Sequence, residues 1–402
     1  TIFSYWTSIV ADCWTDSYKN IMTANQTNIH FESRGIEFVV NSPDEFNALQ
    51  ASMRKLLESL QLWQHVDAVI LDTKDNYQCT YKLKEVSREQ WAPAWDTTRL
   101  YSTMGIDSQK NANDLEKEIL VSMLIATIPF TFPSFDELVS AIRIRHYVVA
   151  AGYKAALNFD TRAIERPADY WHYDEVGGFL LNKGQSIIDG LIKATQPSSS
   201  KDAYSFSCYR ATEYVVLLSI AQELKNVNPD LLKKLELRSE RSAIRSGEFH
   251  QIFLKEYGTL ENPFPMKYYV PGDRVWFRNP DDRSSDISGY EGSWVIYLGH
   301  NLFTNFWKRD QPFSLEAKCV EVYHWRDGAF IGDDGQLQMN EEIVESCVKQ
   351  SMADPVKYQM IIDRMMCYRD PQGVYKDGGC IDASRESPRY VRPSTSDLNF
   401  SD

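Results

Sequence analysis

The segment from Asp202 to Ser219, "DAYSFSCYRATEYVVLLS", places a cysteine at the expected start of a helix. The residues before Cys208 are typical of a strand or loop, and the apolar residues after it recur at the spacing of a half-buried helix. Free N–H groups at a helix start lower the pKa of a thiol. Cys208 is therefore a candidate nucleophile, although a cysteine is more often an inert, buried residue.

A thiolate nucleophile needs partners, and these define what the rest of the chain must supply. A cysteine on a helix start, with a histidine and a carboxylate or amide on strands packed against it, is the papain-type arrangement for acyl transfer. The backbone N–H groups of Tyr209 and Arg210 are placed to stabilise an oxyanion. The sequence must then be searched for a β-rich region that carries an imidazole.

Composition excludes several other classes of function. The chain has 402 residues and a net charge of −13, which disfavours binding to nucleic acid or to an anionic membrane. Its seven cysteines are irregularly spaced without a CxxC pair, so we expect no structural zinc site. No P-loop, GxGxxG or HExxH sequence is present, and we expect no metal or nucleotide cofactor.

The cysteine usage favours a reducing compartment, with one or two disulfides still possible. The first residues, "TIFSYWTSIVADCW", lack the basic and apolar regions of a signal peptide. No apolar run reaches the roughly 18 residues that span a membrane.

The periodicity predicts an α+β protein with three parts. Strands at Ile36–Val40 and Val66–Asp72 flank a helix capped by Ser42 or Asp44, which indicates an α/β domain over residues 1–130. Residues 131–352 form the expected catalytic domain, and 353–402 a C-terminal helix and a mobile tail. We expect further helices at 111–128, 133–157, 185–195, 208–224, 228–245 and 340–351. Strands are expected in 170–184, 266–281, 288–307 and 317–332.

Four stretches between Phe135 and Thr304 resemble the small bacterial protein-glutamine γ-glutamyltransferases (transglutaminases) of spore coats. They are "AIRIRHYVVAAGYKAAL", "YWHYDEVGGFLLNKGQSIIDGL", "YSFSCYRATEYVVLLSI" and "VPGDRVWFRNPD…GYEGSWVIYLG". The last is the most specific, because it is similar to that family's GD-x-hydrophobic-x-F-K/R-N-P strand. The third stretch puts Cys208 on the family's catalytic cysteine.

The resemblance implies acyl transfer and a transglutaminase-type fold, in which the cysteine helix packs on an antiparallel sheet. Cys208 would attack the γ-carboxamide of a protein-bound glutamine, and a lysine amine or water would resolve the thioester. The expected partners are a protein with a reactive glutamine and an amine donor. Because members of that family are short, the additional residues 1–130 suggest a secreted toxin or delivered effector.

The match departs from the family pattern at its acidic residues. Ser207 stands where the family has an acidic residue before its cysteine, and Ser293 aligns with the family's key glutamate. Glu291 lies two residues earlier, which is one strand repeat, so a bulge would return its carboxylate to the same face. A solvated turn carboxylate is the alternative interpretation of Glu291.

The histidine is also displaced, because Phe306 aligns with the family's catalytic histidine. His324 is the first replacement, since Val320, Val322 and His324 alternate as on one face of a strand. His300, after the turn "LGHN", is the second. Structural roles for both remain open.

Three other functions stay open at this point. A glutamine deamidase would use the same site with water in place of the amine. A scaffold or binding protein would keep the fold without activity, as the unmatched glutamate and histidine allow. A cysteine protease on a papain-like architecture is the third.

Overall fold

The computed structural model describes residues 29–40, 42–72, 77–159, 165–198, 202–243, 246–370 and 378–400. The chain forms two compact units, Thr1–Glu32 and Ser33–Asp402. The architecture given below is that of the second unit. None of its described helices combines the length and apolar character needed to cross a bilayer.

A four-stranded sheet begins the second unit, with the order β2-β3-β1-β4. Its strands are β1 (Ile36–Val40), β2 (Val66–Asp72), β3 (Tyr77–Leu83) and β4 (Phe130–Phe132). Helix α2 (Pro43–Ser59) joins β1 to β2 and is capped by Ser42, as predicted. The two strands are not neighbours, because β3 lies between them and pairs antiparallel with both.

Helices α5 (Ala112–Ile125), α6 (Phe135–Lys154), α7 (Ile187–Thr195) and α8 (Cys208–Val227) form the centre of the fold. One continuous hydrophobic core runs from Phe38 in β1 through Val148 in α6 to Leu217 in α8. The N-terminal sheet therefore shares its core with the helices, and a separate domain over residues 1–130 stays a prediction. The smaller elements of the unit are α3 (Glu85–Trp91), α4 (Leu100–Met104), α9 (Pro229–Ser239), α10 (Ser246–Phe253), α11 (Asp282–Ser285), β5 (Asn158–Phe159), β6 (Trp171–Asp174), β7 (Gly178–Leu181) and β8 (Ser205–Phe206).

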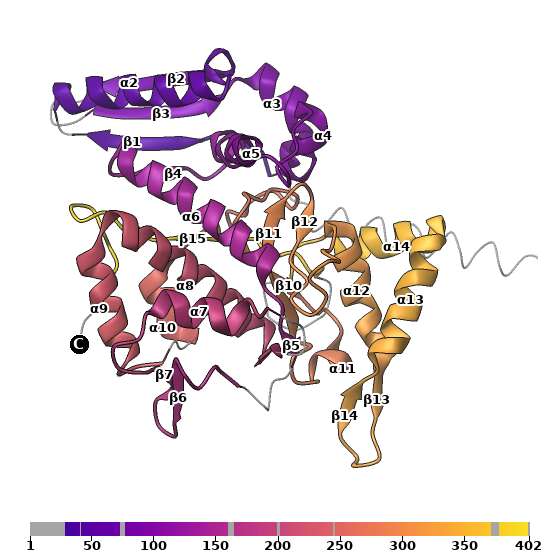
Figure 1. The fold of residues 1–402 in the computed structure, drawn as a ribbon. Helices are drawn as coiled ribbons and strands as arrows, with labels where there is room; N and C mark the ends of the chain where they lie inside the picture. The colour runs from indigo at the N-terminus through magenta and orange to yellow at the C-terminus, as the bar shows by residue number, and fades with distance from the viewer. Residues whose placement is uncertain are drawn as a thin grey trace, which may run out of the picture. The chain divides into compact units, whose positions relative to one another are not determined.

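A five-stranded sheet lies beside these helices, with the order β12-β11-β10-β15-β9 (Figure 1). Its strands are β9 (Leu254–Tyr257), β10 (Arg274–Arg278), β11 (Gly292–Gly299), β12 (Leu302–Phe303) and β15 (Arg385–Pro388). Along β11, Ile296 and Leu298 join the core of α6 and α8, whereas Val295 and Tyr297 join a second core. The period-two alternation of a strand thus separates two cores across one sheet.

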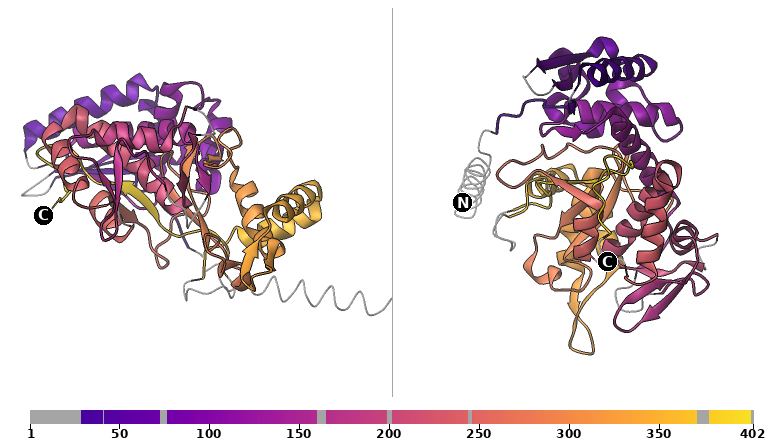
Figure 2. Two further views of the ribbon diagram at one scale, coloured as in Figure 1. Left: turned by 60° about the horizontal axis from the view of Figure 1, so that its bottom comes forward. Right: turned by 90° about the vertical axis from the view of Figure 1, so that its left-hand side faces the viewer.

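The second core is covered by three helices that follow β12: α12 (Leu315–Gly328), α13 (Glu341–Ala353) and α14 (Pro355–Met365). The strand predicted for residues 317–332 is wrong over most of its length, because Ser314 caps a helix there. Only β13 (Ala329–Ile331) is extended, and it pairs with β14 (Leu337–Met339) in a hairpin that projects away from the sheet (Figures 1 and 2).

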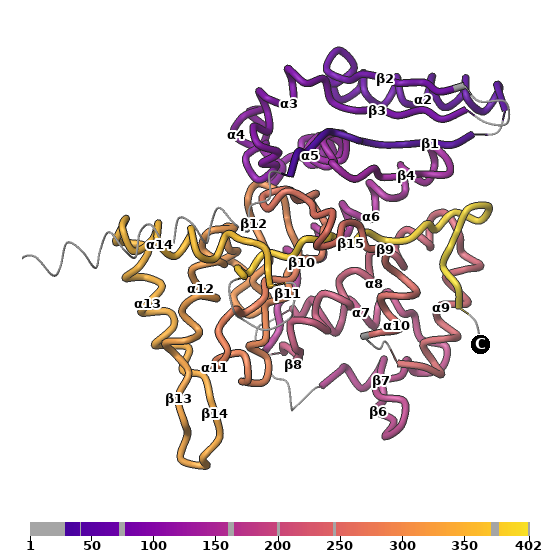
Figure 3. Tube along the Cα trace, turned by 180° about the vertical axis from the view of Figure 1, so that it is seen from behind, coloured from indigo at the N-terminus to yellow at the C-terminus, as the bar shows by residue number. Residues whose placement is uncertain are grey.

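The tail predicted to be mobile is also corrected. Residues 385–388 form β15, which pairs with β9 over four residues and with β10 at Glu386 (Figure 3). Val391 and Leu398 are buried in the main core. The C-terminal segment is therefore part of the sheet and of the core.

A buried ion pair joins α6 to the start of β10. The Arg145 guanidinium, 1% exposed, donates to Asp273 Oδ1 at 2.8 Å and to the carbonyl of Pro271 at 3.1 Å. Asp273 Oδ2 accepts from the Val270 N–H at 2.8 Å. Because both charges are buried, each depends on the other and on these backbone groups.

Replacing Asp273 by Asn leaves a buried guanidinium without its counter-charge, and we expect the free energy of unfolding to fall by about 3–5 kcal/mol. The matched control is Glu58→Gln, which breaks an exposed ion pair with Arg54 and should cost about 0–1 kcal/mol. Urea unfolding followed by circular dichroism measures both. Equal losses of unfolding free energy in the two variants would contradict the prediction that the buried pair of Arg145 and Asp273 stabilises the fold more than an exposed pair does.

Candidate functional site

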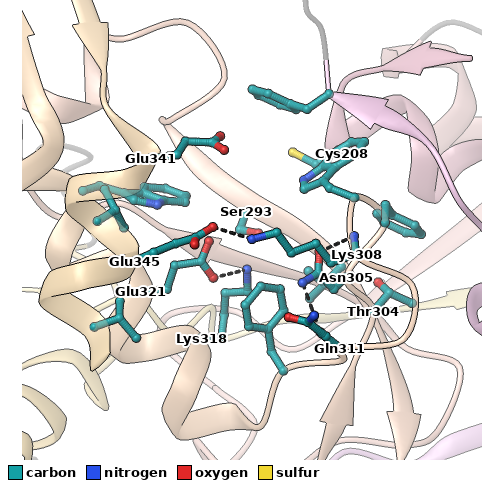
Figure 4. Close-up of a pocket in the computed structure, with 18 of the residues that line it drawn as sticks. Cys208, Ser293, Thr304, Asn305, Lys308, Gln311, Lys318, Glu321, Glu341 and Glu345 are labelled. Atoms are coloured by element: carbon teal, nitrogen blue, oxygen red, sulfur yellow. Dashed lines mark hydrogen bonds and ion pairs between the residues drawn. The ribbon is translucent and has the colours of Figure 1, made fainter. Parts of the chain in front are cut away.

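Cys208 is the first residue of α8 and lines a cavity of about 440 Å³. Ser293 and Trp294 of β11 contribute to the same lining, as do α12 and α13 on the other side. Figure 4 shows the sulfur pointing into this pocket, toward the side chains of α12 and α13. The expected cysteine at a helix start therefore opens onto a cavity large enough for a substrate side chain.

The environment of the sulfur contains opposing electrostatic influences. Burial raises the pKa of the Cys208 thiol, and the nearby Glu291 carboxylate raises it further. Backbone hydrogen bonds from Trp294 and Tyr209 and the positive charge of Lys318 act in the opposite direction. Because burial dominates and the pKa is raised overall, the thiol needs a group that accepts its proton before it can attack.

Ser207, at the position that is acidic in the resembled family, is the N-cap of α8. Its Oγ accepts a hydrogen bond from the Arg210 N–H at 3.3 Å. Serine is among the preferred N-cap residues, so this position orders the helix start. The N–H of Tyr209 is left for the sulfur.

The side of the pocket formed by α12 and α13 carries charged groups that the sequence interpretation missed. Lys318, only 3% exposed, donates to Glu321 at 2.8 Å, and its Nζ lies 3.5 Å from the centre of the Phe313 ring. Glu345 pairs with Lys308, and Glu341 accepts a hydrogen bond from the Tyr290 hydroxyl at 2.7 Å. These residues line the pocket with Cys208.

A sequence feature could have located this helix. Lys318, Glu321 and Trp325 have the i, i+3, i+7 spacing of one helical face. Ser314 is of a residue type that is preferred at a helix N-cap. The alternation of Val320, Val322 and His324 obscured it.

Glu291 lies close enough to the thiol to raise its pKa, although it does not line the pocket. Its carboxylate accepts the Gly289 N–H at 3.0 Å. Ser293, at the position of the family's glutamate, does line the pocket, as does Phe306 at that of the histidine.

Neither predicted histidine lines the pocket with Cys208. His324 lies on helix α12, and its ring is hydrogen-bonded to Asp327 and Ser351. Burial lowers its pKa. His300 occupies a left-handed turn, stacks on Tyr101 at 3.9 Å, and has a lowered pKa because of burial. The strand predicted around His324 is thus wrong, and the positions of His324 and His300 do not support a role beside Cys208.

A histidine that the sequence interpretation did not consider lies behind the site. His250 Nε2 is 2.9 Å from the Arg274 guanidinium, and Nδ1 is 3.0 Å from Glu386. Because an arginine only donates, Nε2 must accept and Nδ1–H must donate to the carboxylate, so the ring is neutral. Burial, with the charge of Arg274, accordingly lowers its pKa to about 4.

The Arg274 guanidinium also holds the residues that flank the sulfur. It lies 3.8 Å from the centre of the Trp294 ring and 4.5 Å from that of Tyr209. Its Nε donates to Thr212 Oγ1 at 2.7 Å. The two residues whose backbones bond to the sulfur are therefore fixed by one buried cation.

Comparison with known proteins identifies the family of this chain. The sequence pattern of the family "Protein-glutamine gamma-glutamyltransferase" matches residues 97–401. This chain belongs to that family. The match extends well beyond the region 135–304 that carried the resemblance, and it includes α12, α13 and β15.

Among solved structures, a transglutaminase from Geobacillus stearothermophilus, without its C-terminal extension, matches this chain. It is 16% identical, with a TM-score of 0.36, and the match covers 54% of this chain and 98% of that one. No curated protein matches the chain.

We expect the neutral His250 to make stability depend on pH. An unfolded histidine titrates near 6.5, whereas His250 titrates at about 4, so between these values the unfolded chain binds more protons. The stability that neutral His250 contributes is present above pH 6.5 and is lost as the pH falls through about 4. His250→Gln, which can still donate to Glu386 and accept from Arg274, should lose less unfolding free energy over this range than the wild type.

Denaturant unfolding at several pH values measures the difference. The control is His172→Gln, at an exposed position in the β6–β7 hairpin, which should keep the wild-type slope. Parallel curves for wild type and His250→Gln would exclude this role for His250.

Proposed function

We propose that this transglutaminase family member transfers the γ-acyl group of a protein-bound glutamine through a thioester on Cys208. The observation that carries the proposal is the position of that sulfur, at a helix start, beside two backbone donors and open to the pocket. Membership of the family supports glutamine as the acyl donor and a protein as the substrate.

In the first step the sulfur forms a bond to the carbonyl carbon of the γ-carboxamide, and the bond from that carbon to nitrogen breaks. The thiol proton is transferred to the leaving nitrogen, which departs as ammonia. In the second step an amine attacks the thioester, loses a proton, and returns the thiol to Cys208. The product is an isopeptide bond when the amine is a lysine side chain.

The N–H groups of Tyr209 and Trp294 stabilise the negative charge of the thiolate and of the oxyanion that forms next to the sulfur. Both make backbone hydrogen bonds with Cys208. Donors fixed in position cost no reorganisation when charge develops in the transition state. We assign them the role that free helix-start N–H groups play in acyl transfer.

Lys318 is proposed as the cation that favours the thiolate. Its charge lowers the pKa of Cys208, and its ion pair with Glu321 holds it in place. A buried lysine with one counter-charge acts strongly on a neighbouring thiol because little water screens it.

Glu291 is proposed as the acceptor of the thiol proton. Its negative charge raises the pKa of Cys208, which keeps the proton on sulfur until substrate binds. Its exposed turn position allows it to exchange that proton with water or with the leaving amine. His324 and His300 receive no part in the reaction, because neither lines the pocket and neither is among the groups whose charge acts on the Cys208 thiol, as Glu291 is.

Deamidation is the second candidate, since water can resolve the same thioester. The pocket is lined by three carboxylates and three lysines, so its charge does not select between water and an amine.

Cys208→Ala should abolish product formation, with a loss of at least about 1,000-fold in kcat/KM, because no thioester can form. Mass spectrometry of a glutamine-containing protein, incubated with and without a primary amine, gives the measurement. Wild type should yield the amine adduct, whereas glutamate alone would indicate a deamidase. Cys367→Ala is the control thiol and should retain activity. Adduct formation by Cys208→Ala, or none by wild type, would contradict the proposal.

Lys318→Met and Glu291→Gln should move the pKa of Cys208 in opposite directions. Loss of the cation raises that pKa, and loss of the carboxylate lowers it. The rate of Cys208 alkylation is measured at several pH values on the peptide that contains Cys208. The resulting curve gives the pKa of the thiol in each variant. Lys308→Met removes a pocket lysine that is paired with Glu345 and should leave the curve in place.

Turnover separates the two proposed roles. Glu291→Gln should lower kcat although its thiol is more acidic, because the proton acceptor is gone. A kcat at or above the wild-type value would remove Glu291 from the reaction. An unshifted alkylation curve in Lys318→Met would remove Lys318.

A further inference from the structure

Three side chains of types that bind metals come together where α12 packs on α13. One nitrogen of His324, one carboxylate oxygen of Asp327 and the sulfur of Cys347 all lie within 4.8 Å of one another. Among the described residues, this is the one group of three or more such side chains that converges. We infer that these three residues bind a divalent cation of the zinc type.

Helical spacing brings the cluster together. His324 and Asp327 are three residues apart on α12, and Cys347 and Ser351 are four apart on α13, so each helix presents a pair on one side. These pairs lie on faces adjacent to those that line the pocket. The cluster is thus distinct from the Cys208 site.

The two helices are held at a fixed separation before any ion binds. A Cβ at Gly328 would lie 2.5 Å from Val344, so only glycine permits this close approach. The Asn340 N–H donates to the Gly328 carbonyl at 2.9 Å, and the β13–β14 hairpin connects the helices directly. The site is therefore largely preorganised.

Ser351 supplies the hydrogen bond that a metal-bound histidine requires. Its Oγ is 2.8 Å from His324 Nε2, while Nδ1 is 2.5 Å from Asp327 Oδ2. Without a metal, Nδ1–H donates to the carboxylate and the serine hydroxyl donates to Nε2. With a metal, Nε2–H donates to the serine, and the lone pair of Nδ1 and the carboxylate share the cation.

The ligand set selects the metal. Imidazole and thiolate suit Zn²⁺ and Co²⁺, whereas Ca²⁺ and Mg²⁺ prefer oxygen ligands. With bonds of roughly 2.0–2.3 Å at tetrahedral angles, ligand atoms lie roughly 3–4 Å apart. His324 Nδ1 and the Asp327 carboxylate oxygen, which are 2.5 Å apart, would therefore separate to admit the ion. Binding releases the Cys347 thiol proton, and Asp327, 44% exposed, leaves the site open to solvent for entry of the ion and for a bound water.

The ion would join two helices that carry one side of the catalytic pocket. Lys318 and Glu321 lie on α12, and Glu341 and Glu345 on α13. The metal would act by fixing their separation and would take no part in the chemistry at the sulfur.

Titration of the reduced, metal-free full chain with Co²⁺ tests the inference. Wild type should develop a thiolate-to-cobalt charge-transfer band that saturates at one ion per chain. Cys347→Ser should lose the band, and Ser351→Ala, which removes no ligand, should weaken binding by about 10–100-fold. Cys367→Ser and Cys208→Ala should keep the band at wild-type affinity.

Thermal unfolding with Zn²⁺ gives an independent measurement, because an ion that binds only the folded chain raises its melting temperature. The rise should appear in wild type and Cys367→Ser and be absent in Cys347→Ser and Asp327→Ala. Both Cys347 and Asp327 are partly exposed, so these variants should fold. Absence of the thiolate band in wild type, or its persistence in Cys347→Ser, would overturn the inference.

Discussion

The buried guanidinium of Arg274 is the constraint on which the site depends. A buried cation without its counter-charge costs several kcal/mol, so the fold must bring its partners to it. Thr212, His250 and Glu386, which surround it, come from α8, α10 and β15. The same group lies against the rings of Tyr209 and Trp294. Neutralising one charge therefore aligns three elements and fixes the two backbone donors beside Cys208.

This constraint explains why the stretch "VPGDRVWFRNPD" is the most specific part of the sequence. Gly272 has a φ of +89°, and a Cβ there would lie 3.0 Å from the Arg145 backbone. Asp273 neutralises Arg145, and the side chain of Asn279 donates to the Tyr290 carbonyl, which shapes the turn before β11. These residues bring β10 and β11 to the cysteine helix, although none of them lines the pocket. Their specificity reflects charge burial and backbone geometry.

Capped helices and the nucleophile were predictable from sequence because their physical causes are local. Ser134 and Ser207 each precede an apolar face of helical period, and the structure confirms both helix starts. Helix α12 was not predictable from alternation, because it lies between the second core and the pocket and has buried residues on several faces. Strand β15 was missed for a different reason. Its sequence, "RESP", has no apolar pattern, since Arg385 and Glu386 are buried through ionic and hydrogen-bonded contacts formed only in the folded chain.

The structure shows which charged side chains lie at the pocket in place of the family's glutamate and histidine. Ser293 and Phe306 leave the β11 side of the pocket without a titratable side chain of their own, whereas α12 brings Lys318 and Glu321 from the second core. Charge at the sulfur then depends on how that core packs against the sheet as well as on the Trp294 N–H of β11. Lys318 is buried and Glu321 balances its charge, so the packing of α12 holds this cation at the pocket. In our proposal α12 thus lowers the pKa of the thiol together with the backbone N–H groups of Trp294 and Tyr209.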